Sequence, residues 1–403
     1  MGSFLVNRAD DGGRTRDLNL GKVPRYQLRY VRIYRVGCLR QECEIYRTTG
    51  VSPNSRPKAS STLSAFMQSG TVSTVPHMFW MGGKLATGLE EISTDPSSLR
   101  EPGFWAVVGS FEGAWLLAKF KNVIEAPLPG DGVWNPIPST AWQSTLNRDS
   151  YIDYVKLVRD EIAAGEVYQV NACRVISANN QENQSLLPLA RAISSGNPAP
   201  YLSYLSVPGL EIASASPERF LSLQDLVITS SPIKGTSATS DFYEKDKAEN
   251  LMIVDLIRND MGAIAEIGSV TTPRLLAVEK HPGLYHLVSD VKAKIGGNLH
   301  FDEVLRSMMP PGSVSGAPKS SALKIIGRLE GERDIYCGAL GWYHNGKAEI
   351  AVAIRTFWQR EDNILHFGTG AGITWGSEAD LEWQETELKA ARLIKIAGGE
   401  AGA

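Results

Sequence analysis

Beyond residue 78 the sequence predicts a folded region that mixes β-strands with α-helices. Two stretches with strand character, 104–108 and 114–120, are joined by a turn that contains glycine. Apolar residues then recur with a helical period over 151–162. Further along, Asn345-Gly346 separates two alternating stretches, which indicates a β-hairpin.

Other elements follow from the same kinds of signal. The alternation of apolar residues favours strands at 167–176, 201–207 and 367–373. Helical periodicity, together with proline and glycine at the ends, favours helices over 242–259, 318–331 and 377–398.

The first 77 residues differ in composition from the rest of the 403-residue chain. They hold 12 Lys and Arg against 5 Asp and Glu, and 60–77 is a polar low-complexity stretch. We expect 1–77 to be a disordered extension, or to lie upstream of a true start at Met78 or Met67. A basic arm or targeting peptide is the alternative, although Asp10, Asp11 and Asp17 do not suit a transit peptide. A catalytic domain is expected over 78–403, with a short N-terminal part (78–140) and a motif-bearing core (141–399).

Composition argues against several classes of function. Residues after 77 hold 29 Lys and Arg against 39 Asp and Glu, so broad nucleic-acid binding is not expected. No apolar run is long enough to span a bilayer, and no membrane partner is expected. The cysteines show no Cys-x-x-Cys spacing, so neither a disulfide framework nor a zinc site is indicated, and a reducing cytoplasm is the expected location. They are Cys38, Cys43, Cys173 and Cys337.

The segment Ser231–Thr236 carries the most informative lysine. It follows the apolar run that starts at Leu226, so it predicts a strand end that turns into a loop holding Lys234. Glu218 stands sixteen residues upstream in a similar position. A carboxyl and an amine in one pocket suit a proton donor and a nucleophile. The alternative is a solvated lysine in a surface loop.

The hairpin around Asn345-Gly346 predicts a second set of polar groups. If 347–359 is one strand, Arg355 rises from a face that otherwise holds alanines, and Tyr343 on the partner strand has small neighbours. Small residues around Arg355 and Tyr343 predict a hollow. The alternative is an arginine on the solvent side of a half-buried sheet.

Two C-terminal segments add further candidates. Gly370 and Gly372 lie in a glycine-rich strand whose N–H groups could approach a ligand closely. In the last helix, Glu382, Glu385 and Lys389 share one face. Two carboxylates aimed at a hollow suit Mg²⁺, whereas the alternative is a solvated helix face.

Together these segments resemble the chorismate-utilising enzymes of the anthranilate synthase component I and aminodeoxychorismate synthase component I family. The resemblance covers roughly 104 to the end, and it rests on ordered motifs. These are Ser-Pro-Glu-Arg-Phe (216–220), Pro-Ile-Lys-Gly-Thr (232–236), Glu-Asn-Leu-Met-Ile-Val-Asp-Leu-Ile-Arg-Asn-Asp (249–260), His286-Leu-Val-Ser, Pro311-Gly-Ser-Val-Ser-Gly-Ala-Pro-Lys, Ala353-Ile-Arg-Thr, Gly370-Ala-Gly-Ile and Gln384-Glu-Thr.

The resemblance implies an α+β fold with two large antiparallel sheets packed face to face and helices outside. It also implies roles for matching residues. Glu249, Glu382 and Glu385 would form the Mg²⁺ shell that presents the ring carboxylate of chorismate, and Glu218 would be the general acid near the departing C4 hydroxyl. The enolpyruvyl carboxylate would be held by Arg355, Tyr343 and backbone N–H groups near Gly370 and Gly372. The remaining substrate contacts would be Thr236, His286, Ser313 and Lys389.

Within the family, Lys234 points to one reaction. Anthranilate synthases usually carry Ala at this position and aminodeoxychorismate synthases carry Lys, whose amine would form a covalent intermediate at C2 that ammonia resolves at C4. Ammonia would come from a separate glutamine amidotransferase, because no Gly-x-Cys-x-Gly nucleophile motif is present. Isochorismate and salicylate synthases place a lysine base where Gln169 stands, and glutamine cannot activate water.

The resemblance thus predicts amination of chorismate at C4 for p-aminobenzoate and folate synthesis. The tryptophan-binding Leu-Leu-Glu-Ser segment of regulated anthranilate synthases is missing, which favours the folate branch. Two alternatives remain open: an anthranilate synthase component I, and a catalytically silent binding subunit that partners an amidotransferase.

Overall fold

The computed structural model describes residues 76–180, 183–237, 239–281 and 284–400. The extension predicted over 1–77 therefore lies outside the described residues, apart from its last two positions. The side chain of Thr236 also lies outside them. The division of 78–403 into two parts stays a prediction.

The helices predicted from periodicity are confirmed, with bounds shifted by a few residues. Asn147 caps the first of them through a hydrogen bond from the backbone N–H of Ser150 (2.9 Å), and Gly165 ends it in the left-handed conformation (φ 84°). No helix in the described part of the chain has the length and apolar character to cross a membrane. The α-helices are α3 (Arg148–Ala164), α4 (Leu187–Gly196), α5 (Glu244–Gly262), α6 (Phe301–Met308), α7 (Lys319–Leu329) and α8 (Ala379–Ala397).

The strands pair antiparallel throughout the described residues and form one hydrogen-bonded network of 18 strands. They are β1 (Met78–Met81), β2 (Lys84–Ser93), β3 (Phe104–Gly109), β4 (Trp115–Glu125), β5 (Trp142–Ser144), β6 (Gln169–Asn179), β7 (Tyr201–Val207), β8 (Leu210–Ser216), β9 (Arg219–Gln224), β10 (Val227–Ser231), β11 (Ile233–Ser237), β12 (Thr271–His281), β13 (Leu284–Lys294), β14 (Gly316–Ala317), β15 (Ala339–His344), β16 (Lys347–Val352), β17 (Thr356–Gln359) and β18 (Ile364–Thr374).

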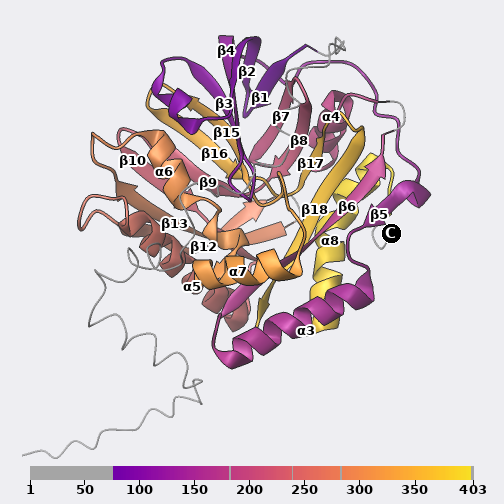
Figure 1. The fold of residues 1–403 in the computed structure, drawn as a ribbon, viewed down its shortest axis with the longest axis vertical. Coiled ribbons are helices and arrows are strands. Elements are labelled where there is room, and N and C mark those ends of the chain that lie inside the picture. Colours follow the sequence, from indigo (N-terminus) through magenta and orange to yellow (C-terminus); the bar gives the residue numbers. More distant parts are fainter. Residues whose placement is uncertain (1–75, 181–182, 238, 282–283, 401–403) are drawn as a thin grey trace, which may run out of the picture. The chain divides into compact units, whose positions relative to one another are not determined.

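The order of pairing confirms the predicted α+β class and shows how the expected sheets are joined. One half of the network runs β13-β10-β9-β16-β15-β3. It continues through β4, β2 and β1 into a second half, β7-β8-β17-β18-β6. Helix α5 packs on β13, and α8 packs on β18 (Figure 1). The two halves are thus continuous rather than separate sheets.

The chain passes directly between the two halves at two places, which we call the crossovers. The first crossover is Pro217-Glu218, between β8 and β9, and the second is Ala353–Arg355, between β16 and β17. The prediction of a single strand over 347–359 is therefore wrong. Regular alternation stops at Val352, and Arg355 takes a left-handed conformation (φ 52°) that β-strands do not allow.

Hydrogen bonds tie the two crossovers to each other. The hydroxyl of Ser216 donates to the carbonyl of Val352 (2.6 Å), and the N–H of Val352 donates to the carbonyl of Glu218 (3.0 Å). The N–H of Ala215 donates to the carbonyl of Arg355 (3.0 Å). Because these groups are buried, leaving any of them unpaired would be costly, so the bonds hold Glu218 and Arg355 on neighbouring segments.

Lys234 also lies in a strand, so the loop predicted at the end of Ser231–Thr236 is wrong. Pro232 interrupts the strand that precedes it, and the chain then continues as β11, which pairs with β13. Gly235 has a φ of 86°, and the register shifts between Ile233 and Thr236. This irregularity is typical of a β-bulge, which changes the direction of a side chain.

A buried apolar cluster lies between α4, α8 and the second half of the network. The rings of Phe357 and Phe367 are in contact there, with centroids 4.7 Å apart. Leu393 of α8 and Ile193 of α4 pack into the same cluster. This packing holds α8, and with it the predicted acidic face of that helix, against β18.

We predict that Ser216→Ala lowers the free energy of unfolding by about 1–3 kcal/mol, because it removes the hydroxyl that accepts a hydrogen bond from the buried N–H of Glu218. The same hydroxyl donates to the carbonyl of Val352, which would keep its other hydrogen bond, from the N–H of Ile354 (2.8 Å). Denaturant-induced unfolding measures the change. Ser203→Ala is the matched control, because Ser203 is as buried, on neighbouring β7, and its hydroxyl has no hydrogen-bond partner within the described residues. Equal losses of stability in the two variants would contradict the role of the crossover bonds.

Candidate active site

Glu218 is the buried carboxyl at the first crossover, with 5% of its surface exposed. Burial raises its pKa to about 7, and this rise already includes the opposing effects of a hydrogen bond with the Ser313 side chain and of the positive charge of Lys234. A carboxyl with a pKa near neutral can hold a proton at pH 7 and donate it. The structure therefore brings together three of the predicted site residues, which are Glu218, Ser313 and Lys234.

Lys234 lies among several carboxyl groups. Burial raises the pKa of Glu218 and Glu249, and the positive charge of Lys234 opposes that effect in both. Lys234 also helps to lower the pKa of Glu385. In the described part of the chain, the ammonium of Lys234 has no ion-pair partner of its own. Its amine thus remains available to a ligand.

Gly372 leaves room for two side chains that approach the same face of β18. A Cβ atom at this position would lie 3.8 Å from Nζ of Lys234 and 2.4 Å from Nε2 of Gln169. Gln169 is only 2% exposed, and neither polar atom of its side chain has a hydrogen-bond partner among the described residues. A buried amide without partners is rare in proteins and indicates a place where a ligand or water completes the site.

Arg355 at the second crossover is the candidate for anion binding. Burial lowers the pKa of its guanidinium, and Glu218 is the neighbouring charge that opposes this shift. No hydrogen bond of its side chain is present within the described residues, so its fork of donors is free for a carboxylate. Nearby, Lys389 donates from Nζ to the carbonyl of Gly370 (3.0 Å), which places that lysine beside the glycine-rich strand.

The three predicted metal ligands come from α5 and α8. Burial raises the pKa of Glu249 and of Glu382. The negative charges of Glu385 and Glu382 raise the pKa of Glu249 further, and the charge of Glu385 raises that of Glu382. Burial acts in the same direction on Glu385, but three lysines together outweigh it and lower the pKa. They are Lys389, whose Nζ lies 2.6 Å from the carboxylate, Lys234 and Lys245. The cluster therefore attracts cations.

Lysines serve as the counter-ions of this cluster. Nζ of Lys245 lies 3.9 Å from Oε1 of Glu249 and 3.6 Å from Oε1 of Glu382. Sequence reasoning did not single out Lys245, because a lysine in the charged first turn of a helix is ordinary in sequence. Only the approach of α5 to α8 reveals it.

Mg²⁺ fits the chemistry of these ligands, although not their present spacing. Carboxylate oxygens are the hard donors that Mg²⁺ prefers, and Glu249 and Glu382 already flank a cation. Within the described residues, however, no three His, Cys, Asp or Glu side chains lie close enough together to hold a metal ion. The Mg²⁺ site stays a prediction that requires the lysines to withdraw.

The remaining predicted residues are placed less directly. His286 is buried on β13, opposite Thr236 of β11. Tyr343 pairs with Ala348 across the hairpin, whereas Ala351 pairs with Leu340. Tyr343 and Ala351, which were both expected to line the hollow, therefore lie on opposite faces of the sheet. The ring of Tyr343 stacks on Phe301 of α6, with centroids 5.2 Å apart. Substrate contact by Tyr343 therefore stays a prediction, and the hollow is not built as expected.

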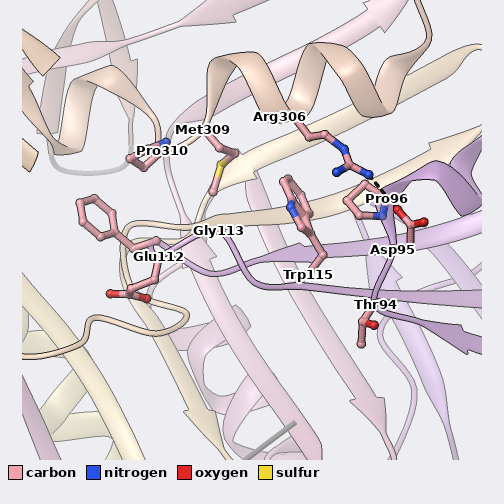
Figure 2. Close-up of a pocket in the computed structure, with 10 residues that line it drawn as sticks. Thr94, Asp95, Pro96, Glu112, Gly113, Trp115, Arg306, Met309 and Pro310 are labelled. Atoms are coloured by element: carbon pink, nitrogen blue, oxygen red, sulfur yellow. Dashed lines mark hydrogen bonds and ion pairs between the residues drawn. The ribbon is translucent and has the colours of Figure 1, made fainter. Parts of the chain in front are cut away.

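Two cavities lie on either side of the segment that follows α6. The smaller, of about 10 Å³, is lined by Glu218, Ser313 and Met308, and is too small for more than a water molecule. The larger, of about 540 Å³, lies between the end of α6 and the β3–β4 turn (Figure 2). Trp115 and the Arg306–Asp95 ion pair line it, whereas none of the predicted site residues does.

Comparisons with known proteins identify the family. The family profile of chorismate-binding enzymes matches residues 131–395. The aminodeoxychorismate synthase component 1 of Klebsiella aerogenes is 37% identical over 275 residues, which cover 64% of this chain and 59% of that protein. The anthranilate synthase component 1 of Aquifex aeolicus is 36% identical over 272 residues, which cover 63% of this chain and 54% of that protein.

Solved structures share the fold. Anthranilate synthase component I from Streptococcus pneumoniae superposes with a TM-score of 0.68 at 22% identity, over 81% of this chain and 94% of that one. The menaquinone-specific isochorismate synthase of Escherichia coli gives a TM-score of 0.65 at 19% identity, over 80% of this chain and 89% of that one. The chain spans less than two thirds of the length of the relatives matched by sequence. The family profile covers more than half of this chain, and its match includes every predicted site residue, so the chain belongs to the chorismate-binding enzyme family.

Proposed function

We propose that this chain converts chorismate and ammonia to 4-amino-4-deoxychorismate, in the manner of an aminodeoxychorismate synthase component I, and so serves p-aminobenzoate and folate synthesis. The observation that carries the proposal is the amine of Lys234, which lies beside Gly372 and near the buried carboxyl of Glu218. Relatives named aminodeoxychorismate synthase component 1, from Klebsiella aerogenes and Escherichia coli, support it.

In the proposed first step, the neutral amine of Lys234 attacks C2 of the chorismate ring. Both ring double bonds shift, from C1=C2 to C1=C6 and from C5=C6 to C4=C5, and the bond between C4 and its hydroxyl breaks. Glu218 gives its proton to the departing oxygen, which leaves as water, and the attached amine loses a proton. The raised pKa of Glu218 suits this role, because the carboxyl must hold its proton until the oxygen departs.

In the second step, ammonia attacks C4 and loses a proton, and the amine of Lys234 takes a proton as its bond to C2 breaks. Both ring double bonds then return to their original positions. The net reaction exchanges the C4 hydroxyl for an amino group and releases one water. We infer that a separate glutamine amidotransferase supplies the ammonia, and the names of the relatives as component 1 are consistent with a second component.

Other residues would hold the substrate. Arg355, with no hydrogen bond in the described part of the chain, would bind the enolpyruvyl carboxylate together with backbone N–H groups near Gly370 and Gly372. Glu249, Glu382 and Glu385 would hold Mg²⁺, which when bound would neutralise the ring carboxylate of chorismate. Ser313, hydrogen-bonded to Glu218, would orient that carboxyl toward the C4 oxygen.

A second candidate is anthranilate synthesis, which the relative from Aquifex aeolicus supports by its name. That reaction places nitrogen at C2, where the proposed attack by Lys234 would compete with ammonia. The two candidates therefore differ in the fate of C2, and product analysis separates them.

We predict that the wild-type chain, given chorismate, Mg²⁺ and ammonium, forms 4-amino-4-deoxychorismate and that Lys234→Ala lowers its rate by more than about a hundredfold, because the nucleophile is lost. Chromatography of the products measures both. Lys292→Ala, on an exposed position of β13, is the matched control. Unchanged formation by Lys234→Ala would refute the covalent role, and anthranilate as the main product of the wild type would reverse the choice of reaction.

We also predict a pH dependence that comes from Glu218. Its protonated form is the active one, so the loss of this proton should lower the rate as the pH rises through about 7, whereas the need for a neutral Lys234 amine acts in the opposite direction. The effect of Glu218 is therefore read from the comparison with a variant that lacks its carboxyl. Folding should respond in the same direction. At a pH between the ordinary carboxyl pKa and about 7, Glu218 is protonated in the folded state but ionised in the unfolded state. The free energy of unfolding should therefore fall as the pH rises through that window.

Glu218→Gln removes both effects. Relative to wild type, it should gain stability between pH 5 and pH 8 by an amount on the order of 3 kcal/mol, while losing about a hundredfold or more in rate. Denaturant unfolding at the two pH values measures the first and initial rates the second. Glu361→Gln, on an exposed turn, is the control. If the stability difference between Glu218→Gln and wild type is the same at both pH values, the raised pKa is refuted.

A further inference from the structure

Lys245 joins two helices that carry the proposed metal ligands. It lies in the first turn of α5, one turn before Glu249, and reaches across to Glu382 in the first turn of α8. Its Nζ atom is within 4 Å of a carboxylate oxygen of each (3.9 and 3.6 Å). A single ammonium thus lies between two carboxylates from different helices. One helix, α5, packs on β13 in the first half of the strand network, and the other, α8, packs on β18 in the second half.

The surroundings of this ammonium distinguish it from an ordinary surface lysine. The side chain of Glu382 is only 4% exposed and that of Glu249 18%, whereas Lys245 itself is 53% exposed. The carboxylates are therefore part of the interior, and the cation reaches them from the solvent side. Such a cation can leave without disturbing the packing beneath it.

We propose that Lys245 is a built-in counter-ion that occupies the cation position between Glu249 and Glu382 and gives way when Mg²⁺ binds. It therefore weakens Mg²⁺ binding and sets the metal concentration that the site requires. This inference rests on the proposed function in one respect, the use of Glu249 and Glu382 as metal ligands.

Two physical effects give the proposal a definite sign. The ammonium pairs with the same oxygen atoms that a metal ion would use, so Mg²⁺ must first break those ion pairs. The ammonium also repels a divalent cation that arrives nearby. Removing the charge therefore strengthens metal binding by both routes. Because Lys245 is half-exposed and its ion pairs are longer than 3.5 Å, each pair is weak and its loss easily reversed.

The experiment compares Mg²⁺ affinities of the metal-free full chain by isothermal titration, without substrate. We expect Lys245→Met to bind Mg²⁺ about three- to tenfold more tightly than wild type. Lys245→Arg, which keeps the charge, should stay close to wild type. The matched control is Lys247→Met on the same helix, because Lys247 pairs with Glu244 (2.7 Å) on the exposed surface and the net charge changes equally.

The outcomes separate this inference from the proposed function. If wild type binds Mg²⁺, Glu382→Gln does not, and Lys245→Met binds no more tightly than Lys247→Met, then the counter-ion role is overturned and the metal site stands. If neither wild type nor Lys245→Met binds Mg²⁺, both the metal site and the counter-ion role are refuted. If Lys245→Met binds Mg²⁺ and wild type and Lys247→Met do not, the counter-ion role is supported most strongly.

Discussion

The hydrogen bonds between the two crossovers are the constraint on which the site depends. Each crossover carries one candidate site residue, Glu218 or Arg355, and neither segment belongs to a regular strand. The hydroxyl of Ser216 and the main-chain groups of Val352 satisfy buried donors and acceptors that the interrupted strands leave behind. The left-handed conformation of Arg355 is unfavourable for a residue with a side chain, and these bonds hold it in place.

Around this framework the site balances charge between lysines and carboxylates. Glu249, Glu382 and Glu385 form an acidic group that runs from the buried Glu382 to the exposed Glu385, and lysines from three different elements neutralise it. Their contributions differ in kind. Lys245 and Lys389 make ion pairs with the carboxylates, whereas Lys234 acts on them only at longer range. That difference leaves the amine of Lys234 as the one best placed to react, and it makes the ion-paired lysines sensitive to any other cation that enters.

Local signals in the sequence predict the elements that local interactions determine. Asn147 and Gly165 bound α3, and Asn345-Gly346 makes the hairpin turn, because caps and turns depend on a few adjacent residues. The break at Arg355 and the strand that holds Lys234 depend instead on partners far away in the chain. Local signals therefore predicted one continuous strand over 347–359, where the chain crosses over, and a loop at Lys234, where it forms β11. The family motifs identified Glu218, Lys234 and the acidic residues together, but no motif indicated how Lys245 lies between them.

The relation of Lys234 to Gln169 suggests how one fold could direct different reactions. Both side chains converge on the space beside Gly372, from β11 and from β6. An amide is not basic, so Gln169 cannot take a proton from water, whereas the amine of Lys234 can act as a nucleophile once it is neutral. Because the backbone at Gly372 leaves room for both side chains, an amine carried by β6 instead of β11 would reach the same space without altering the fold. A change of this kind affects side chains alone, because the crossovers keep Glu218 and Arg355 in the same place.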